Sequence, residues 1–402
     1  MKQFIDALYE QLDKKKERII KIREELHAHA EESFKEQWTA QYILDFYKDL
    51  DCEVKSSVGN GYGIVVTIDS LKPGKTLALR ADFDALPIKE ETNLPFASKT
   101  EAMHACGHDG HTAYLLVLAE TLIELKDQFS GEIIILHQNA EEASPGGAKS
   151  MIEAGCLEGV DNVIGMHFMS NMPVGTINYH IGNAQTGRDN FHLTIHGQGG
   201  HASSPHSAND TIVAASYFVM SVQTIISRRL NPFDVGSITI GNFNGVGANN
   251  AINGKVVLGG DVRSIAPETS QKIEEEIRNK VKGIEATFGV TCDLDYIHDY
   301  PVLYNDPDIT EFAIRAIQSH PFDELKGIHA VSPQPPSEDF AYYAQKVPST
   351  FLWIGCQSED QEKHPAFPHH HPKFYMDEGA LIVAAKGMAA IVATYLEENN
   401  IK

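Results

Sequence analysis

The sequence predicts an α/β protein that carries a second, α+β domain inserted within it. Strand and helix patterns alternate in the first part of the chain and again after residue 299, while the stretch between them has a different, strand-rich pattern. The length of 402 residues also favours two domains, because single hydrophobic cores stop growing at roughly 250–300 residues. We therefore expect an outer domain of residues 1–185 and 299–402 and an insert of residues 186–298.

The outer domain begins with apolar residues at helical spacing in residues 2–29, which predict one or two amphipathic surface helices. Aliphatic runs bounded by Gly, Lys and Pro predict strands at 63–68 and 76–80. A helical pattern over 112–125 and a strand-like run over 132–137 then complete a βαβ unit, which implies parallel strands covered by helices. Further strands are expected at 162–166 and 350–355, and a closing helix at 378–396.

The insert alternates strands and helices in the order β-helix-β-β-helix-β. Its strands are expected at 191–196, 237–243, 256–263 and 291–296, and its helices at 211–229 and 269–288. This order is typical of a ferredoxin-like α+β sandwich with both helices on one face of the sheet.

Composition argues against several classes of function. The chain has 33 Lys and Arg against 55 Asp and Glu, a formal charge of −22 that repels nucleic acids and anionic membranes, so we expect neither as a partner. No run approaches the roughly 20 apolar residues of a membrane helix, and the first residues lack a signal-peptide pattern, so we expect a cytoplasmic protein. Five cysteines without a CxxC pair indicate neither a disulfide framework nor a local zinc finger.

The densest group of reactive side chains is HACGHDGH, residues 104–111. Cys106 and His108 stand two positions apart in a Gly-containing loop, so both can face one cation. Thiolate and imidazole are ligands that borderline divalent metals prefer. The alternative is that these histidines cap a helix or make ordinary hydrogen bonds.

A second candidate group is Glu141-Glu142, which follows the predicted strand ending at His137. Adjacent acidic residues usually serve solvation, but in a non-helical loop they can point in different directions. One carboxylate can then bind a metal while the other acts as a general base.

Further histidines extend the candidate ligand set. His167 follows an apolar strand, and three consecutive histidines lie at 369–371. The candidate ligands are therefore Cys106, His108, Glu142, His167 and His370 or a neighbour. A catalytic zinc normally uses three protein ligands, so five indicate two metals that share a bridging group. His201 lies in the Gly-rich segment 197–205. One interpretation is that this loop brings His201 to another surface, and the alternative is that His201 is an incidental residue of a turn.

Over nearly its whole length the sequence resembles the two-metal aminoacylases, carboxypeptidases and related amidohydrolases. In that family a zinc-peptidase-like α/β catalytic domain, with a mixed sheet flanked by helices, carries an inserted lid or dimerisation domain. The resemblance rests on LRADFDALPI (79–88), HACGHDGH (104–111), NAEE (139–142), GMH (165–167), GQGGHASSP (197–205), GGDVRS (259–264) and HHPKF (370–374). These blocks resemble the Cys-containing branch, which includes N-acyl-amino-acid amidohydrolases, indole-acetyl-amino-acid hydrolases and N-acetyl-diaminopimelate deacetylases.

The resemblance implies roles for particular residues. The implied ligands of two divalent ions, Zn, Mn or Co, are Cys106, His108, Glu142, His167 and His370. Glu141 is the implied catalytic base. Asn250 and His201 are implied to hold the substrate or its oxyanion, with His201 reaching the site of a partner subunit, which requires a homodimer. Apart from the resemblance, the free carboxylate of the substrate needs a cationic or amide partner, and the candidates are Arg188, Arg228, Arg263 and Asn250.

The implied activity is hydrolysis of N-acyl amino acids, in particular N-acetyl amino acids, by a metal-bound hydroxide with Glu141 as general base. The nearest alternative is a dinuclear carboxypeptidase or aminopeptidase that acts on short peptides, and the third is a non-catalytic metal-binding protein. Ala30 and Asn253 stand where the family pattern has proline. Both lie outside the metal set, so they affect substrate detail rather than reaction class.

Overall fold

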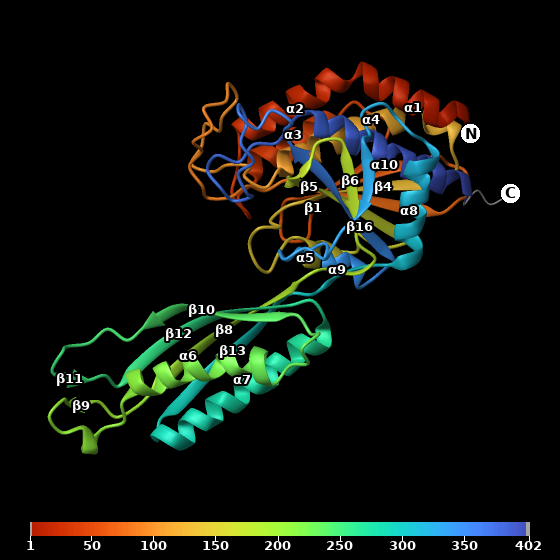
Figure 1. The fold of residues 1–402 in the computed structure, drawn as a ribbon. Coiled ribbons are helices and arrows are strands. Elements are labelled where there is room, and N and C mark those ends of the chain that lie inside the picture. Colours follow the sequence, from red (N-terminus) through yellow and green to blue (C-terminus); the bar gives the residue numbers. More distant parts are fainter. Residues whose placement is uncertain (1, 399–402) are drawn as a thin grey trace. The chain divides into compact units, whose positions relative to one another are not determined.

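The computed structural model describes residues 2–398, which form two compact units (Figure 1). The second unit consists of Asn183–Leu303 and Pro333–Glu338, and the first unit contains the rest of the described chain. The second unit therefore begins at 183 rather than the expected 186 and ends at 303 rather than 298, and it takes in one short segment from further along the chain.

The first unit is built on an eight-stranded mixed sheet with the strand order β1-β2-β4-β3-β5-β16-β6-β15. Its strands are β1 (Glu53–Val58), β2 (Gly63–Asp69), β3 (Thr76–Asp82), β4 (Glu132–Gln138), β5 (Asn162–Pro173), β6 (Thr176–Tyr179), β15 (Gly327–Ala330) and β16 (Ser349–Gln357). The central strands β4, β3, β5 and β16 pair in parallel, whereas β2 is antiparallel to β4. The carboxyl ends of the parallel strands therefore meet at one edge, where open α/β sheets place their sites.

Helices α4 (His108–Glu124) and α10 (Gly379–Glu398) pack on this sheet. Helices α1 (Lys2–Lys14) and α2 (Lys16–Ala28), which are the amphipathic pair expected near the N-terminus, pack over α4 and α10. The unit also contains α3 (Gln37–Tyr47), α5 (Ala148–Glu153), α8 (Pro307–Ser319) and α9 (Ala341–Ala344). One apolar core joins the N-terminal helices, α4, α10 and the sheet.

Among the described residues, α10 alone is long and apolar enough to cross a membrane by length and composition. Of its most apolar stretch, 94% is buried inside the first unit, as in a core helix. The expectation that no apolar run approaches this length is therefore wrong for α10.

The second unit contains a four-stranded antiparallel sheet with the order β10-β12-β8-β13, and two helices pack on it (Figure 1). Its elements are β8 (Gly187–His196), α6 (Thr211–Arg228), β10 (Gly236–Asn244), β12 (Lys255–Ser264), α7 (Pro267–Phe288) and β13 (Thr291–Tyr300). Phe191, Leu193 and Ile195 alternate along β8 and are buried in a separate apolar core with α6 and α7. The predicted fold class, including the insert, is confirmed.

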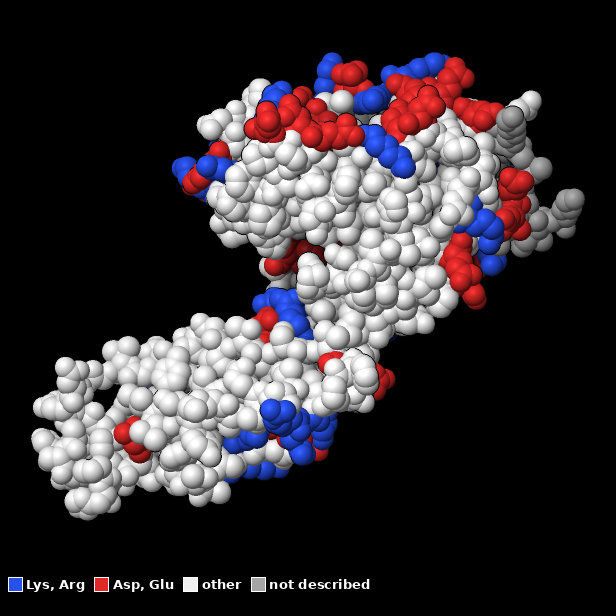
Figure 2. Space-filling view, viewed as in Figure 1, with Lys and Arg blue, Asp and Glu red and all other residues white. Residues whose placement is uncertain are grey.

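The acidic side chains are unevenly distributed on the face shown in Figure 2. On the face shown in Figure 2, Asp and Glu side chains gather over the N-terminal helices, with Lys and Arg between them. Glu10 and Lys14 form one such exposed pair, at 2.6 Å. Solvent screens exposed pairs of this kind, so they stabilise the fold little, and this face is a solvated cover.

Candidate metal centre

The structure brings all five predicted metal ligands together. Cys106 precedes α4, His108 begins it, Glu142 follows β4, His167 lies in β5, and His370 lies between β16 and α10. The ligand atoms of Cys106, His108 and His167 lie within 4.8 Å of one another, as do those of Cys106, Glu142 and His370. The two groups share Cys106, which is the arrangement that two ions with a common ligand require.

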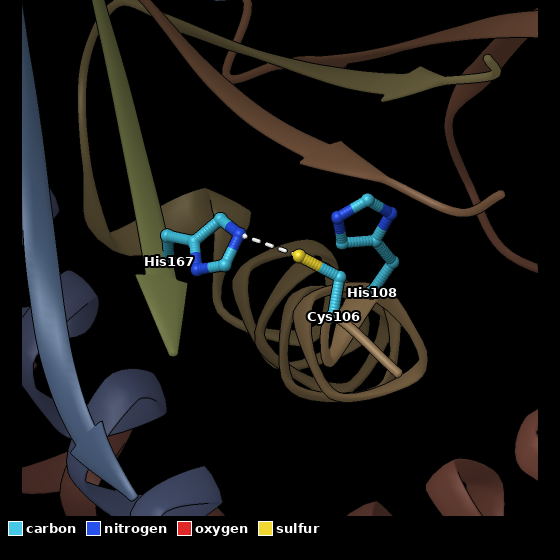
Figure 3. Close-up of side chains that lie close together, drawn as sticks. All are labelled: Cys106, His108 and His167. Carbon is cyan, nitrogen blue, oxygen red and sulfur yellow. Dashed lines mark hydrogen bonds between the residues drawn. The ribbon is translucent and has the colours of Figure 1, made fainter. Parts of the chain in front are cut away.

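Figure 3 shows three of these side chains, with Cys106 Sγ lying 3.4 Å from His167 Nε2. His370 Nε2 lies 3.1 Å from Glu142 Oε1, and His108 Nε2 lies 4.0 Å from the same oxygen. Metal–ligand bonds are about 2.0–2.3 Å long, so two ligand atoms on one tetrahedral ion lie about 3–4 Å apart. The spacings therefore suit shared ions.

Gly107 separates the first two ligands. Its φ of 91° lies in the left-handed region, which glycine enters without the steric penalty that a Cβ brings. The chain turns there from the loop of Cys106 into the first turn of α4, which begins with His108. The conformation of this one residue lets both side chains face the same site.

Hydrogen bonds orient two of the imidazoles. His108 Nδ1 donates to the Asp84 main-chain oxygen at 3.0 Å and lies 3.2 Å from the Asp84 carboxylate, and His167 Nδ1 donates to the Phe168 carbonyl at 2.6 Å. Both rings are thus left with Nε2 toward the site. Metal-ligating histidines typically use the second ring nitrogen in this way.

The residues fit a group of metal ions. His108 Nε2 is buried and has no hydrogen-bond partner in the part of the chain that the structure describes. Thiolate, imidazole and carboxylate donors together suit zinc and similar divalent cations. The carboxylate oxygens nearest to His108 Nε2, on Asp82 and Glu142, lie 3.5 Å and 4.0 Å away, so an ion in contact with this nitrogen would supply the bond that no hydrogen-bond partner makes.

The negative charges of the carboxylates around the site also favour a bound cation. Burial alone would lower the pKa of His108, but the carboxylates of Asp82, Asp84 and Glu142 outweigh burial and raise this pKa to about 10. Burial, and then the charges of Glu142 and Glu141, raise the pKa of the Cys106 thiol well above its usual value. A divalent ion would balance the carboxylates in place of the proton on His108 and favour the thiolate.

Glu141 and Glu142 leave β4 through a fixed turn. Ala140, just before them, has a φ of 53° and is buried. Its N–H donates to Glu36 Oε1 at 2.8 Å, and its carbonyl accepts from the Gly147 N–H at 3.0 Å. Glu141 is buried and has a carboxylate oxygen within 4.8 Å of the ligand atoms of His108 and Glu142.

The three consecutive histidines have different surroundings. His370 is the one grouped with Cys106 and Glu142. His369 Nε2 instead donates to the Phe168 carbonyl at 2.9 Å, and His371 stacks on Phe367.

The predicted substrate residues lie in the second unit. His201 pairs with Ala251 between β9 (Gly200–His201) and β11 (Ala251–Ile252), and the Ala202 N–H donates to the Asn250 carbonyl, so His201 and Asn250 share one exposed tip. The His201 ring lies 2.7 Å from Ser203 Oγ.

Arg263 lies in β12 of the same unit. Its guanidinium donates to Asp261 Oδ1 at 2.8 Å and to Ser337 Oγ at 3.1 Å. The side chain is 29% exposed, so it keeps access to solvent although its orientation is fixed.

Two carboxylates at the end of β3 are contributors that the sequence reasoning did not single out. Asp84 orients His108 and accepts the Glu142 N–H at 3.0 Å, and Asp82 contacts His111 at 2.5 Å. Both lie within the segment LRADFDALPI. Two residues that are two positions apart on a strand point to the same face of the sheet. This spacing of two acidic residues at the end of a buried strand could have identified Asp82 and Asp84 from the sequence.

Comparisons with known proteins match most of the chain. The model of peptidase family M20/M25/M40 matches residues 78–394. The putative amidohydrolase YhaA of Bacillus subtilis (strain 168) is 39% identical over 389 residues, 96% of each chain. Thermostable carboxypeptidase 1 of Saccharolobus solfataricus is 36% identical over 94% of this chain and 95% of its own. The N-acetylcysteine deacetylase of Bacillus subtilis is 34% identical over 94% and 97%.

Solved structures of similar proteins have the same fold as this chain. A putative aminohydrolase from methicillin-resistant Staphylococcus aureus superposes with a TM-score of 0.93 at 52% identity, covering 97% of this chain and 99% of its own. Bacillus subtilis YXEP, described as a dinuclear metal-binding peptidase of the M20 family, superposes with a TM-score of 0.82 at 32% identity over 96% and 99%. The chain therefore belongs to peptidase family M20/M25/M40 and is a metal-dependent hydrolase of its amidohydrolase branch.

Proposed function

We propose that this protein hydrolyses the amide bond of N-acyl amino acids, with N-acetyl amino acids as its substrates. The observation that carries the proposal is the pair Glu141-Glu142: Glu142 is grouped with Cys106 and His370, while Glu141 lies buried beside it. A base thus stands next to the ligands of the proposed ions. The similarity to a protein named N-acetylcysteine deacetylase supports this substrate class.

The chemistry that two bound divalent ions supply is polarisation of the scissile carbonyl and a lowered pKa of a water molecule. Glu141 accepts a proton from this water as the water oxygen bonds to the carbonyl carbon. Glu141 then donates the proton to the amide nitrogen while the carbon–nitrogen bond breaks. The products are the acyl carboxylate and the free amino acid.

His201, Asn250 and Arg263 bind the substrate in this proposal. His201 donates a hydrogen bond to the oxyanion from a partner subunit, Asn250 holds the substrate beside it, and Arg263 pairs with the substrate carboxylate. The shared exposed tip of His201 and Asn250 supports a joint role. Asp261 accepts hydrogen bonds from Arg263 Nε at 2.8 Å and NH2 at 3.4 Å, and Ser337 Oγ accepts one from NH1 at 3.1 Å. These contacts hold the guanidinium in one orientation and leave one N–H on each terminal nitrogen for a substrate carboxylate.

A homodimer is part of the same proposal. β10 is an edge strand of the second unit, and α6 exposes Val213, Tyr217 and Met220, with exposed fractions of 51%, 56% and 74%. An unpaired edge and an apolar helix face favour association with a second copy. Mixing Glu141→Gln with His201→Ala protein should restore activity, because hybrid dimers hold one complete site; no recovery would overturn the shared site.

A carboxypeptidase acting on short peptides is the second candidate, because Thermostable carboxypeptidase 1 is as similar to this chain as the deacetylase is. The test is a panel of N-acetyl amino acids and dipeptides with the same C-terminal residues, run after chelation and reloading with Zn²⁺, Mn²⁺ or Co²⁺. We expect a higher kcat/KM for the N-acetyl amino acids. Faster cleavage of the dipeptides would favour the carboxypeptidase, and no hydrolysis of either class would overturn both.

A further inference from the structure

We propose that His111, held by Asp82, is a positioning residue of the metal centre: it fixes the main chain that orients the His167 ring. This inference rests on the proposed function, because it takes His167 as a metal ligand. His111 is the last histidine of HACGHDGH and belongs to α4. Neither Asp82 nor His111 is among the five predicted ligands.

Both ring nitrogens of His111 are engaged. The Phe168 N–H donates to His111 Nε2 at 3.1 Å, so this nitrogen carries no proton. The proton of the neutral ring is therefore on Nδ1, which donates to Asp82 Oδ1 at 2.5 Å. Arg80 NH1 in turn donates to Asp82 Oδ2 at 2.7 Å. His111 has no free nitrogen for an ion, although it lies in a cluster with Asp82 and His108.

Phe168 requires partners because of its place in the sheet. On one side of β5 Phe168 lies opposite Ile354 of β16, whereas on the other side β3 pairs with β5 only as far as Gly165, opposite Arg80, so Phe168 lies beyond the last residue paired with β3. A buried N–H or carbonyl without a strand partner must be satisfied in another way. His111 takes the N–H, while His167 Nδ1 and His369 Nε2 donate to the carbonyl at 2.6 Å and 2.9 Å.

These contacts act on His167 from two sides. His111 anchors the peptide group that directly follows His167, and the Phe168 carbonyl holds His167 Nδ1. The ring is then directed so that Nε2 lies 3.4 Å from Cys106 Sγ (Figure 3). The His111 ring also packs against His167, with 4.7 Å between ring centroids.

The burial of the chain of contacts makes it rigid. Asp82, His111 and Phe168 have exposed fractions of 0%. Removing a group that holds a metal ligand in place typically weakens metal binding about 10- to 100-fold, and His111 holds His167 through the Phe168 peptide group. We expect a loss of this size for the ion that His167 binds.

The experiment loads the full-length protein with Co²⁺ and compares two variants. His111→Met fills the space without making hydrogen bonds, whereas the amide of His111→Gln can replace both. Affinity for Co²⁺ is measured by competition with a chelator, the thiolate-to-cobalt absorption reports the geometry at Cys106, and circular dichroism checks the fold. His137→Met is the matched control, because His137 is buried at the end of β4 and its ring hydrogen-bonds to Tyr47.

We expect His111→Met to weaken binding of one ion about 10- to 100-fold and to change the cobalt absorption. His111→Gln and His137→Met should stay close to the wild-type protein. Wild-type affinity and absorption in a folded His111→Met protein would overturn the inference. If His111→Met does not fold, His111→Asn decides: its shorter amide should bind the ion more weakly than His111→Gln, and equal binding would overturn the inference.

Two further variants separate this inference from the proposed function. Cys106→Ser should abolish the thiolate-to-cobalt absorption, and His167→Ala should lose one tightly bound ion. If both bind metal as the wild-type protein does, the metal centre itself is wrongly assigned. If both behave as expected while His111→Met does not, only the positioning role fails.

Discussion

Glu141 and Glu142 carry the same carboxylate but lie in different surroundings. His370 Nε2 lies 3.1 Å from Glu142, whereas Glu141 is buried behind the turn at Ala140. The left-handed φ of Ala140 and the two hydrogen bonds that hold its main chain fix the turn before them. At the scale of the residue, main-chain geometry thus supports two different roles for one residue type.

Substituting each glutamate should separate these roles. Glu141→Gln should keep two bound ions and lose about 10²- to 10⁴-fold in kcat, which is the usual contribution of a general base. Glu142→Gln should instead lose metal affinity, because an amide is a weaker ligand than a carboxylate. Metal content and steady-state turnover check both variants, and a Glu141→Gln protein with wild-type kcat would contradict the assignment of the base.

Glu36 gives the protein a pH-dependent stability. Burial, and then the charge of Asp84, raise the pKa of Glu36 from 4.5 to about 8. Between these two values the folded state binds more protons than the unfolded state, so stability falls as the pH rises, by up to about 1.4 kcal/mol per pH unit. The loss is complete above the folded-state pKa.

Replacing Glu36 with glutamine should remove this dependence. Glu36→Gln keeps an oxygen for the Ala140 N–H, so its free energy of unfolding should rise relative to that of the wild-type protein between pH 5 and pH 8. Denaturant unfolding of the metal-loaded proteins at several pH values measures the difference. The exposed Glu17→Gln is the control, and a difference between Glu36→Gln and wild type that is constant with pH would contradict the prediction.

At the scale of the element, the start of α4 shows how structure and site are joined. The apolar pattern predicts a helix from residue 112, but α4 begins at His108. Its first turn, His-Asp-Gly-His, has no apolar side chain, so the periodicity does not reveal it. The residues that carry the chemistry are therefore those that the helical pattern omits.

Gly107→Ala tests this helix start. Among residues 2–398 and outside its chain neighbours, the nearest atom to an added Cβ is 3.6 Å away, so the expected effect is backbone strain at a φ of 91°, about 1–2 kcal/mol. Relief of that strain should move Cys106 relative to His108 and weaken metal binding. The control is Gly159→Ala: Gly159 has a φ of 77°, and an added Cβ there would have no atom of the described chain within 4 Å outside its chain neighbours. It should lose similar stability while binding metal normally, and equal metal affinities in the two variants would contradict the prediction.

At the scale of the whole molecule, local patterns predict the insert well. The strand expected at 237–243 is β10, Gly236–Asn244, and the helix expected at 269–288 is α7, Pro267–Phe288. In contrast, the sequence pattern does not predict that β16 lies between β5 and β6, because that order depends on contacts between distant segments.

In the candidate site, too, some features could be predicted from the sequence and others could not. The types of the five ligands could be predicted from their chemistry, but the choice of His370 among three histidines rests only on its His-x-Pro spacing to Pro372. The contacts of Asp82 and His111 could not be predicted, because they depend on where β3 ends beside β5. Reactive groups are therefore easier to recognise in a sequence than the groups that hold them in place.

Removing the ions should destabilise the two units unequally. All five proposed ligands belong to the first unit, where they join four segments, whereas the second unit has its own apolar core. Each ion present at 100 times its dissociation constant stabilises the folded state by about 2.7 kcal/mol, and chelation removes that amount. It also leaves the carboxylates of Asp82, Asp84 and Glu142 without the ions that would balance them. Hydrogen exchange with and without a chelator should therefore show faster exchange in the first turn of α4 and in the turn at Ala140, with little change in α6 and α7. Re-addition of Zn²⁺ should reverse the effect, and equal acceleration in both units would contradict a metal centre confined to the first unit.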